Sequence, residues 1–299
     1  MKRSLIALMI GICAAAAAAD SSNWTLGILT GPSPFELSTP PGITNPVLRG
    51  SDVTDLPNID TLAHPFMVIE GGLYYLFFTA KNHAADKGGI GMAESADGLT
   101  WKYRRAVVHE AFVTAHPFIF KVANDYYMIP ESHTEPFLRL YRATRFPDEW
   151  KYERDLMRGD RFISPVMVQY NDVWWMYTIP SGNATLRLFY SKSPLGQWTE
   201  HPMSPIVRND LRTARPAGRP LLIDGKLYRL GMDCVPTYGR QVRAFQVTRI
   251  SPTVYSEALR EEPLVKASGS GWNAEAMHHV DAHQIAKGRW IAAVDALGK

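Results

Sequence analysis

The stretch at residues 62–78, LAHPFMVIEGGLYYLFF, returns about fifty residues later at residues 114–130 as TAHPFIFKVANDYYMIP. Both copies read Ala-His-Pro-Phe, an apolar run, a polar turn and a pair of tyrosines that enters a second apolar run. Weaker copies occupy residues 163–179, 214–232 and 280–296. Prolines of the first four copies stand 52, 48 and 51 residues apart, at Pro65, Pro117, Pro165 and Pro216. A period of this length predicts repeated structural units.

Each copy reads as a unit of four strands. The proline opens a first strand, where its missing N–H does least harm, and a turn such as EGG or YND leads to an aromatic second strand. A third strand such as LRLYRAT follows, and the unit closes on a strand with tryptophan or charges, as in DGLTWKYRR. Five such units predict an all-β fold, a five-bladed β-propeller. The fifth copy has only two strands, so we expect residues 23–31 to complete that blade and close the ring.

The composition is that of an ordinary globular domain, with 46% hydrophobic residues, 20% charged residues and a formal net charge of +3. No basic tract indicates nucleic acid as a partner, and no segment is long and apolar enough to predict a transmembrane helix. The beginning of the chain, MKRSLIALMIGICAAAAAAD, has the charged, apolar and small-residue order of a secretory signal. We therefore expect a signal peptide over residues 1–19, a propeller over residues 20–299, and a monomer that is periplasmic or secreted.

The repeat also predicts where a site should form. The first strand of every propeller blade lines the central channel, so the residue before each proline should lie near one mouth of it. Read across the five copies, with Ala282 in the place of the fifth proline, these residues are His64, His116, Ser164, Arg215 and Asp281. The ring therefore predicts that side chains far apart in the chain converge on one pocket.

Several phrases carry a resemblance to known proteins: DVTDLP, MIPES, SPLGQWTEHPMSPIV, ARPAG, CVPTYGRQVRAF and KASGSGWNAEAMHHVDAHQ. With them, residues 23–295 resemble the propeller-like N-terminal region of glucosamine inositolphosphorylceramide transferases and their bacterial relatives. The repeat is also similar to that of five-bladed propeller glycoside hydrolases, in the arabinanase/xylosidase and invertase/levansucrase groups. That second resemblance implies three acidic groups on the inner strands. This sequence has His64, Ser164 and Arg215 at the matching places, so the resemblance supports the fold more than the mechanism.

Two carboxylates remain near the expected mouth. Glu131 ends a second strand directly after a proline, and Asp281 lies on the ring itself. Hydrolysis of a glycosidic bond uses two carboxyl groups, one protonated and one ionised, so these two are the candidate catalytic pair. The alternatives are that Glu131 only forms an ion pair with a base such as Arg215, and that Asp281 only caps a turn or strand.

The candidates for substrate binding are His64, His116, Arg215, His278, His279, Trp272 and Asp233. The imidazoles suit sugar hydroxyls or a phosphate. Together with a carboxylate they could hold a divalent cation, although no close-spaced metal motif is present and no metal ligand is assigned. The guanidinium suits a carboxylate or phosphate, and Trp272, in a glycine-rich loop, suits the face of a sugar. Asp233 is a weaker acidic candidate.

Two functions follow from these residues. The first is an exported carbohydrate-active enzyme, a glycoside hydrolase or transglycosylase that works in a polar pocket at the channel mouth. The second is a non-catalytic propeller that binds a glycan or glycolipid. The dense polar ring favours the enzyme, whereas the missing acids at His64 and Ser164 favour the binding protein. Either function predicts a carbohydrate or glycolipid as the ligand.

Overall fold

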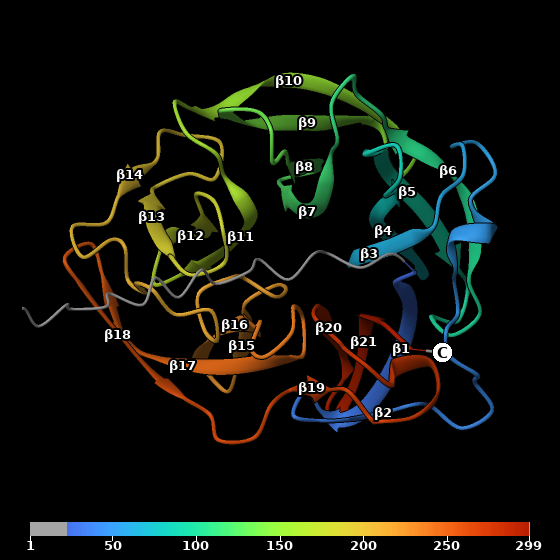
Figure 1. Cartoon of the computed structure of the whole chain (residues 1–299). Coiled ribbons are helices and arrows are strands. Elements are labelled where there is room, and N and C mark those ends of the chain that lie inside the picture. The colour runs from blue at the N-terminus through green and yellow to red at the C-terminus, as the bar shows by residue number, and fades with distance from the viewer. Residues whose placement is uncertain (1–22, 299) are drawn as a thin grey trace, which may run out of the picture.

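The computed structural model describes residues 23–298, which form five antiparallel sheets arranged in a ring around a central axis (Figure 1). Sheets that follow one another along the chain occupy neighbouring places in the ring, so each sheet is one blade of a propeller. The helical elements of this part of the chain are two 3₁₀ turns, η1 (Gly50–Asp52) and η2 (Gly271–Asn273). The prediction of an all-β five-bladed propeller is confirmed.

The first four blades are built from consecutive strands that run from the channel outward. Blade 1 contains β3 (Thr61–Glu70), β4 (Leu73–Asn82), β5 (Lys87–Ser95) and β6 (Lys102–Val108). Blade 2 contains β7 (Ala115–Val122), β8 (Asp125–Glu131), β9 (Phe137–Arg145) and β10 (Glu149–Arg158). Blade 3 contains β11 (Ile163–Tyr170), β12 (Val173–Ile179), β13 (Arg187–Ser191) and β14 (Thr199–Glu200). Blade 4 contains β15 (Leu221–Ile223), β16 (Lys226–Asp233), β17 (Gln241–Ser251) and β18 (Val254–Leu259), with the short β19 (Val265–Lys266) beside β17.

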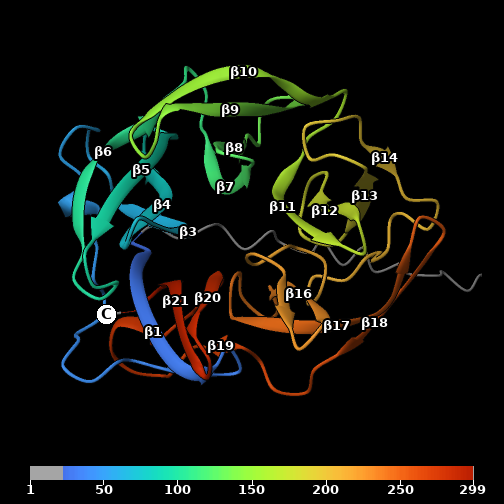
Figure 2. The same cartoon turned by 180° about the vertical axis from the view of Figure 1, so that it is seen from behind.

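The fifth blade joins the two ends of the described chain. Its inner strands are β20 (Val280–Ala286) and β21 (Arg289–Ala296), and its outer strands are β1 (Thr25–Ser33) and β2 (Glu36–Ser38). β1 pairs with β21 without interruption from Thr25 opposite Ala296 to Gly31 opposite Trp290. Figures 1 and 2 show this blue strand beside the red ones from both sides. The N-terminal segment therefore closes the ring, as the truncated fifth copy predicted.

The repeated prolines each fall in a different blade. Pro65, Pro117 and Pro165 lie near the beginning of β3, β7 and β11, and Pro216 forms a bridge with Gly231 just before β15. At the first three prolines the pairing register shifts, between Ala63 and Phe66 in β3 and at the matching places in β7 and β11. A proline that cannot donate to the ladder is tolerated at such a bulge. The repeat in the sequence is therefore a repeated bulge at one end of the inner strands.

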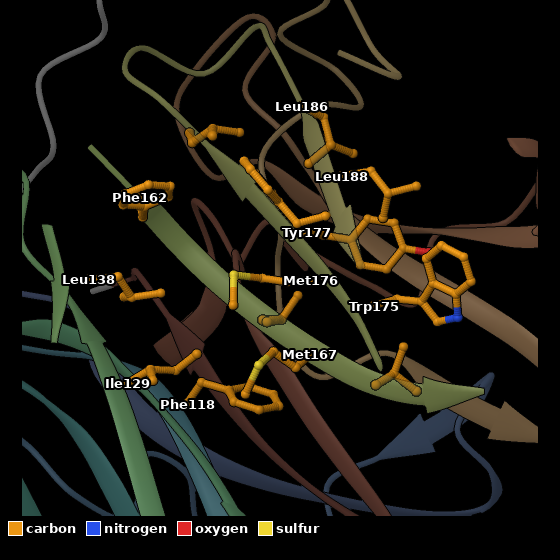
Figure 3. Packing of buried hydrophobic residues seen from close by; sticks show 14 of the residues in the cluster. Phe118, Ile129, Leu138, Phe162, Met167, Trp175, Met176, Tyr177, Leu186 and Leu188 are labelled. Atoms are coloured by element: carbon orange, nitrogen blue, oxygen red, sulfur yellow. The ribbon is translucent and has the colours of Figure 1, made fainter. Parts of the chain in front are cut away.

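Aromatic second strands fill the space between neighbouring blades. Figure 3 shows Met176 of β12 on the side of Phe118 and Met167, from the inner strands of blades 2 and 3, whereas Trp175 and Tyr177 point to the other face of the blade, toward Leu188. Trp175 and Tyr177 are almost completely buried, so their rings pack between blades. The recurrence of aromatic residues at matching positions of the second strands indicates the same role. Burying side chains of this size contributes about 1.5–3 kcal/mol each, which holds the blades in fixed positions around the channel.

The signal peptide predicted over residues 1–19 lies outside the described residues. The propeller predicted over residues 20–299 is described from residue 23 to residue 298. Within that range, none of the helical elements has the length and apolar character needed to cross a lipid bilayer.

Candidate functional site

The inner strands give the channel two different ends. We call the end at which these strands begin the first mouth and the end at which they finish the second mouth. At the first mouth the bulges place His64, His116 and Ser164 in left-handed backbone conformation, with φ of 51°, 49° and 50°. Residues other than glycine adopt this conformation at a cost, so the surrounding contacts must hold it.

A polar side chain from the preceding blade fastens each of these bulges. The three backbone donors and their acceptors are His64 N to Asp295 Oδ2 (2.8 Å), His116 N to Thr79 Oγ1 (2.9 Å), and Ser164 N to Glu131 Oε2. Each acceptor lies on the second strand of its blade, and each donor on the first strand of the next blade. These bonds satisfy buried N–H groups that the bulge removes from the ladder. They also join blade 5 to blade 1, blade 1 to blade 2, and blade 2 to blade 3.

A pocket of about 300 Å³ opens at the first mouth. The polar side chains of its wall come from all five blades and their connecting loops: Thr61, His64, Thr79, Lys81, Glu131, His133, Asn183, Arg215, Tyr238 and His278. Of the residues that the ring was expected to bring together, His64, Arg215 and Glu131 line this pocket, and the binding candidate His278 joins them. His116 lies directly behind this wall, because its ring centroid is 5.3 Å from that of His64.

Glu131 and Arg215 form one wall of this pocket. The Oε2 atom of Glu131 accepts hydrogen bonds from the backbone and the hydroxyl of Ser164, and Oε1 lies 3.8 Å from an Nη atom of Arg215. The guanidinium also donates to Ser164 Oγ at 3.1 Å and to Asn183 Oδ1 at 3.0 Å, and its centre lies 5.4 Å from the ring of Tyr238. The ion-pair alternative for Glu131 is thus present. In addition, its hydrogen bonds to Ser164 join blade 2 to blade 3.

Four imidazoles form a layer beneath the pocket, which we call the histidine layer: His64, His116, His278 and His279. The rings of His64 and His278 stack with centroids 4.9 Å apart, and His116 and His279 meet edge to face at 5.2 Å. All four are buried. Phe66 lies under the layer, 5.0 Å from the ring of His116 and 4.7 Å from that of His279. The phenyl ring therefore separates the histidine layer from the rest of the channel.

Three members of the histidine layer, His64, His116 and His279, are uncharged at neutral pH. Burial first, and then the neighbouring imidazoles and Arg215, hold the pKa of His64 and of His116 well below the usual value. Burial lowers the pKa of His279 to about 4. A neutral imidazole has one donor and one acceptor nitrogen. No described residue hydrogen-bonds to either ring nitrogen of His116 or His279, or to Nε2 of His64. Five ring nitrogens of the histidine layer are thus buried without a partner among the described residues.

His278 has a partner that the sequence did not suggest, Asp295. Its Oδ1 lies 2.6 Å from Nδ1 of His278 and accepts the backbone N–H of the same residue, while Oδ2 accepts the N–H of His64. The carboxylate is completely buried. A signal was present in the sequence, because Thr79, Glu131 and Asp295 are all polar residues near the end of otherwise apolar second strands.

The structure does not bring Asp281 into this pocket. The fifth copy has no proline, and β20 pairs with β21 from Val280 onward, as β3 resumes its pairing with β4 at Phe66 after the bulge. His278, two residues before Val280, therefore takes the place that corresponds to His64. Asp281 lies deeper, because it accepts the N–H of Met67 at 2.6 Å. Met67 is three residues beyond His64 along β3, about 10 Å at the usual strand rise.

The partners of Asp281 belong to the second mouth. Its Oδ1 accepts Nε–H of Arg219 at 2.9 Å, and Oδ2 lies 3.0 Å from Nε2 of His283. Burial alone would raise the pKa of Asp281, but these two residues and the N–H of Met67 outweigh it and hold that pKa well below its usual range. The carboxylate is therefore ionised and fully engaged. Glu131 and Asp281 share no partner and do not line a common pocket.

Two further candidates also lie outside the pocket. Asp233 is buried in blade 4, where it accepts hydrogen bonds from Gln241 at 2.9 Å and from Arg243 at 3.0 Å. Trp272, in η2, packs beside β1 so closely that a side chain on Gly27 would collide with its ring. The glycine-rich loop therefore supports the fifth blade. Among residues 23–298, no group of three or more His, Cys, Asp or Glu side chains is arranged to hold a metal ion.

Comparison with known proteins places this geometry in a family. The family model described as the N-terminal part of glucosamine inositolphosphorylceramide transferase 1 matches residues 16–297. The chain belongs to this family. A relative named glucosamine inositolphosphorylceramide transferase 1 from rice, Oryza sativa subsp. japonica, is 36% identical over 297 residues. The protein of that name from Arabidopsis thaliana is 34% identical over 303 residues.

These matches cover most of the chain but only part of the relatives. They include 91% and 92% of this chain, but 40% and 39% of the two plant proteins. The chain therefore spans about two fifths of the length of the relatives it matches.

Solved structures with the same fold include glycoside hydrolases. A family 117 glycoside hydrolase from the marine bacterium Zobellia galactanivorans superimposes with a TM-score of 0.57 at 17% identity, over 81% of this chain and 87% of that one. A glycosyl hydrolase from Bacteroides ovatus gives a TM-score of 0.59 at 13% identity, over 85% and 92%. At this identity the likeness shows the shared propeller fold.

Proposed function

We propose that this chain is a carbohydrate-recognition propeller of an exported protein, and that it binds a glycosyl group of a glycan or glycolipid in the pocket at the first mouth. The observation that carries the proposal is the polar wall of this pocket, in which Nε2 of His64 is buried without a protein partner, with four more such nitrogens, of His116 and His279, in the histidine layer behind it. Buried polar atoms are almost always hydrogen-bonded, so these nitrogens indicate polar groups that come from outside the protein. Sugar hydroxyls both donate and accept, which suits neutral imidazoles.

The rest of the pocket agrees with such a ligand. Lys81, His133 and Arg215 face the same space as a single carboxylate, Glu131. Tyr238 adds an aromatic surface beside the guanidinium, at 5.4 Å. Arginine binds phosphate with two parallel hydrogen bonds, so a phosphate next to the sugar would add to the affinity.

The names of the relatives support the same class of ligand. The name glucosamine inositolphosphorylceramide transferase refers to an amino sugar and a phosphorylated sphingolipid. The solved propellers with this fold include proteins named as glycoside hydrolases. A carbohydrate or glycolipid therefore fits both the pocket and the names of the relatives and of the solved structures with this fold. The signal-like beginning of the chain supports export to the periplasm or beyond.

Binding is favoured over hydrolysis by the position of the carboxylates. A glycosidase of the usual type places two carboxyl groups on either side of one bond. Here Glu131 belongs to the first mouth, whereas the partners of Asp281 belong to the second, and each carboxylate is held by its own basic group. The pair that the sequence suggested is therefore not assembled around one substrate.

One observation favours an enzyme as the second candidate. Asp295 lies 2.6 Å from Nδ1 of His278, and His278 lines the same pocket as Glu131. A buried carboxylate that holds Nδ1–H leaves Nε2 of the imidazole as a proton acceptor, the arrangement of a general base. Glu131 would then be the proton donor in glycosyl transfer or hydrolysis.

Calorimetry with the whole exported protein tests the binding proposal. The probes are methyl glucosaminide, inositol phosphate and a glycosyl inositolphosphorylceramide in detergent micelles. We expect binding of at least one probe, and we expect Arg215→Gln to weaken the phosphate-bearing probes about tenfold, because it removes a charge-assisted hydrogen bond. Arg158→Gln, which changes an exposed arginine of β10, serves as the matched control and should leave binding unchanged. Absence of binding to all three probes, or equal effects of the two variants, would overturn the proposal.

The enzymatic candidate is tested by sugar release. If aryl glycosides or the glycolipid are cleaved, His278→Gln and Glu131→Gln should each remove turnover, while Asp281→Asn should retain it. Binding without release of any sugar leaves recognition as the function.

A further inference from the structure

The second mouth contains a site that the proposed function does not use. Two hollows of about 420 and 570 Å³ meet there, and they share Phe120, Lys121, Arg219, His283 and Gln284. Because they have these side chains in common, the hollows form one continuous groove, which we call the second-mouth groove. Each hollow is in the size range of small-molecule binding sites. Phe66 is completely buried between this groove and the histidine layer, so the two mouths are separate sites.

Every cation that we find in the groove wall has an acidic partner there. Arg219 Nε donates to Asp281 Oδ1 at 2.9 Å, and Nη1 donates to the carbonyl of Ile119 at 3.0 Å. His283 lies 3.0 Å from the other oxygen of Asp281. Lys121 donates to Glu70 at 2.8 Å. The charges of Arg219 and Lys121 are therefore balanced by those of Asp281 and Glu70, and the groove offers no excess of fixed positive charge to attract a phosphate or a carboxylate.

The remaining wall of the groove combines aromatic rings with amides. Trp174 and Trp290 line one hollow, and Tyr74 and Tyr126 line the other. Gln169 and Gln284 are exposed at the ends of β11 and β20, where their amides present both donors and acceptors. The guanidinium of Arg219 is held flat against Phe118, with its centre 4.7 Å from the ring. Apolar ring faces bordered by fixed planar polar groups match a ligand that has both C–H faces and hydroxyls.

We infer that the second-mouth groove is a binding site for an uncharged oligosaccharide. Sugar rings would pack against the aromatic side chains, and their hydroxyls would exchange hydrogen bonds with Gln169, Gln284 and the free edge of the Arg219 guanidinium. The charge balance separates this ligand from the phosphate-bearing one proposed for the first mouth. The inference does not rest on that proposal, because no residue lines both the pocket and the groove.

Titration of the whole exported protein with neutral and acidic tetrasaccharides tests this site. Cellotetraose, xylotetraose and mannotetraose are the neutral probes and tetragalacturonate is the acidic one, with calorimetry and tryptophan fluorescence as readouts. We expect one neutral probe to bind, and Trp174→Ala to weaken it about tenfold. Trp198→Ala is the matched control, since Trp198 packs on the same core cluster but does not line the groove.

A second pair of variants avoids any effect on folding. Gln284→Ala should weaken the same probe severalfold, whereas Gln197→Ala, an exposed glutamine outside the groove, should not. Arg215→Gln at the first mouth should also leave this binding unchanged. No binding of any neutral tetrasaccharide, tighter binding of tetragalacturonate, or equal effects of Gln284→Ala and Gln197→Ala would overturn the inference. So would a dimer in light scattering that Leu222→Lys dissociates, because Leu222 lines the groove and is half exposed.

Discussion

The two mouths of this propeller differ in whether their polar side chains have partners within the protein. At the second mouth the cations Arg219 and Lys121 are matched by the carboxylates of Asp281 and Glu70, and His283 lies 3.0 Å from Asp281. At the first mouth five buried imidazole nitrogens have no partner among the described residues. The backbone differs as well, because the inner strands begin with left-handed bulges at the first mouth and end in tight turns at the second. A mouth whose polar atoms are already satisfied is prepared for a neutral ligand, whereas a mouth with unsatisfied atoms requires one that supplies hydrogen bonds.

The largest effect that would sharpen this comparison concerns Asp295. Its carboxylate accepts the N–H of His64, the N–H of His278 and Nδ1–H of His278, all in a fully buried position. Asp295→Ala leaves three buried donors without an acceptor, and we expect it to lower the free energy of unfolding by about 3 kcal/mol or more. Urea denaturation measures this change.

Asp295→Asn, which keeps one acceptor oxygen, should lose less stability than Asp295→Ala. Equal stability of Asp295→Ala and the parent protein would show that the first mouth does not depend on this carboxylate.

Acid should act on the first mouth before it acts on the second. Burial lowers the pKa of His279 from 6.5 to about 4, and the unfolded chain therefore takes up the proton first. The stability contributed by the neutral imidazole is complete above about pH 6.5 and is lost as the pH falls from there toward 4. We expect a loss of about 3 kcal/mol from His279 alone over that window. Urea denaturation at several pH values measures it.

The control for the acid effect lies at the second mouth. The pKa of Asp281 is held below its usual value of 3.8, so its contribution is lost only at lower pH. His279→Gln should flatten the dependence between pH 6.5 and 4, whereas Asp281→Asn should not. A dependence that His279→Gln leaves unchanged would contradict the assignment to the histidine layer.

The smallest expected effect concerns Thr79, the hydroxyl that joins blade 1 to blade 2. Its Oγ1 accepts the N–H of His116 at 2.9 Å and lies 3.1 Å from Nδ1 of His64. Thr79→Val keeps the shape but removes the acceptor, so we expect a loss of about 1–2 kcal/mol in urea denaturation. Thr79→Ser retains the hydroxyl and should lie closer to the parent. A larger loss for the serine variant would mean that packing, rather than the hydrogen bond, fastens this bulge.

The sequence predicted the frame of the molecule and one part of its site. Repeated prolines indicated five blades, and the truncated fifth copy indicated that the N-terminal strand would close the ring, which β1 does. The same equivalence brought His64 and Arg215 to one mouth, because a repeat places matching residues at matching depths. It also accounts for Glu131, which ends a second strand at that mouth.

The equivalence was misleading where the repeat had decayed. Ala282 stood in for the missing fifth proline, so Asp281 was placed where His278 lies, an error of three residues. An odd shift along a strand changes both the depth and the face of a side chain, and it moved Asp281 toward the wrong mouth. Asp295 was missed because its role depends on a donor in another blade, His64, which local sequence does not reveal. Asn183 and Tyr238 come from loops that the repeat does not constrain.

Because β1 closes the ring, the first mouth can form only late in the synthesis of the chain. Strand β1 pairs with β21, whose residues are made more than 250 positions later. Until β20 and β21 have left the ribosome, the fifth blade has no inner half, and His64 of blade 1 lacks both the Asp295 acceptor and the stacked ring of His278. Contacts at such separation form late, because a long loop must close first. A chain that stops before β21 lacks Asp295 and cannot complete the histidine layer, so the first mouth forms only after β21 has been made.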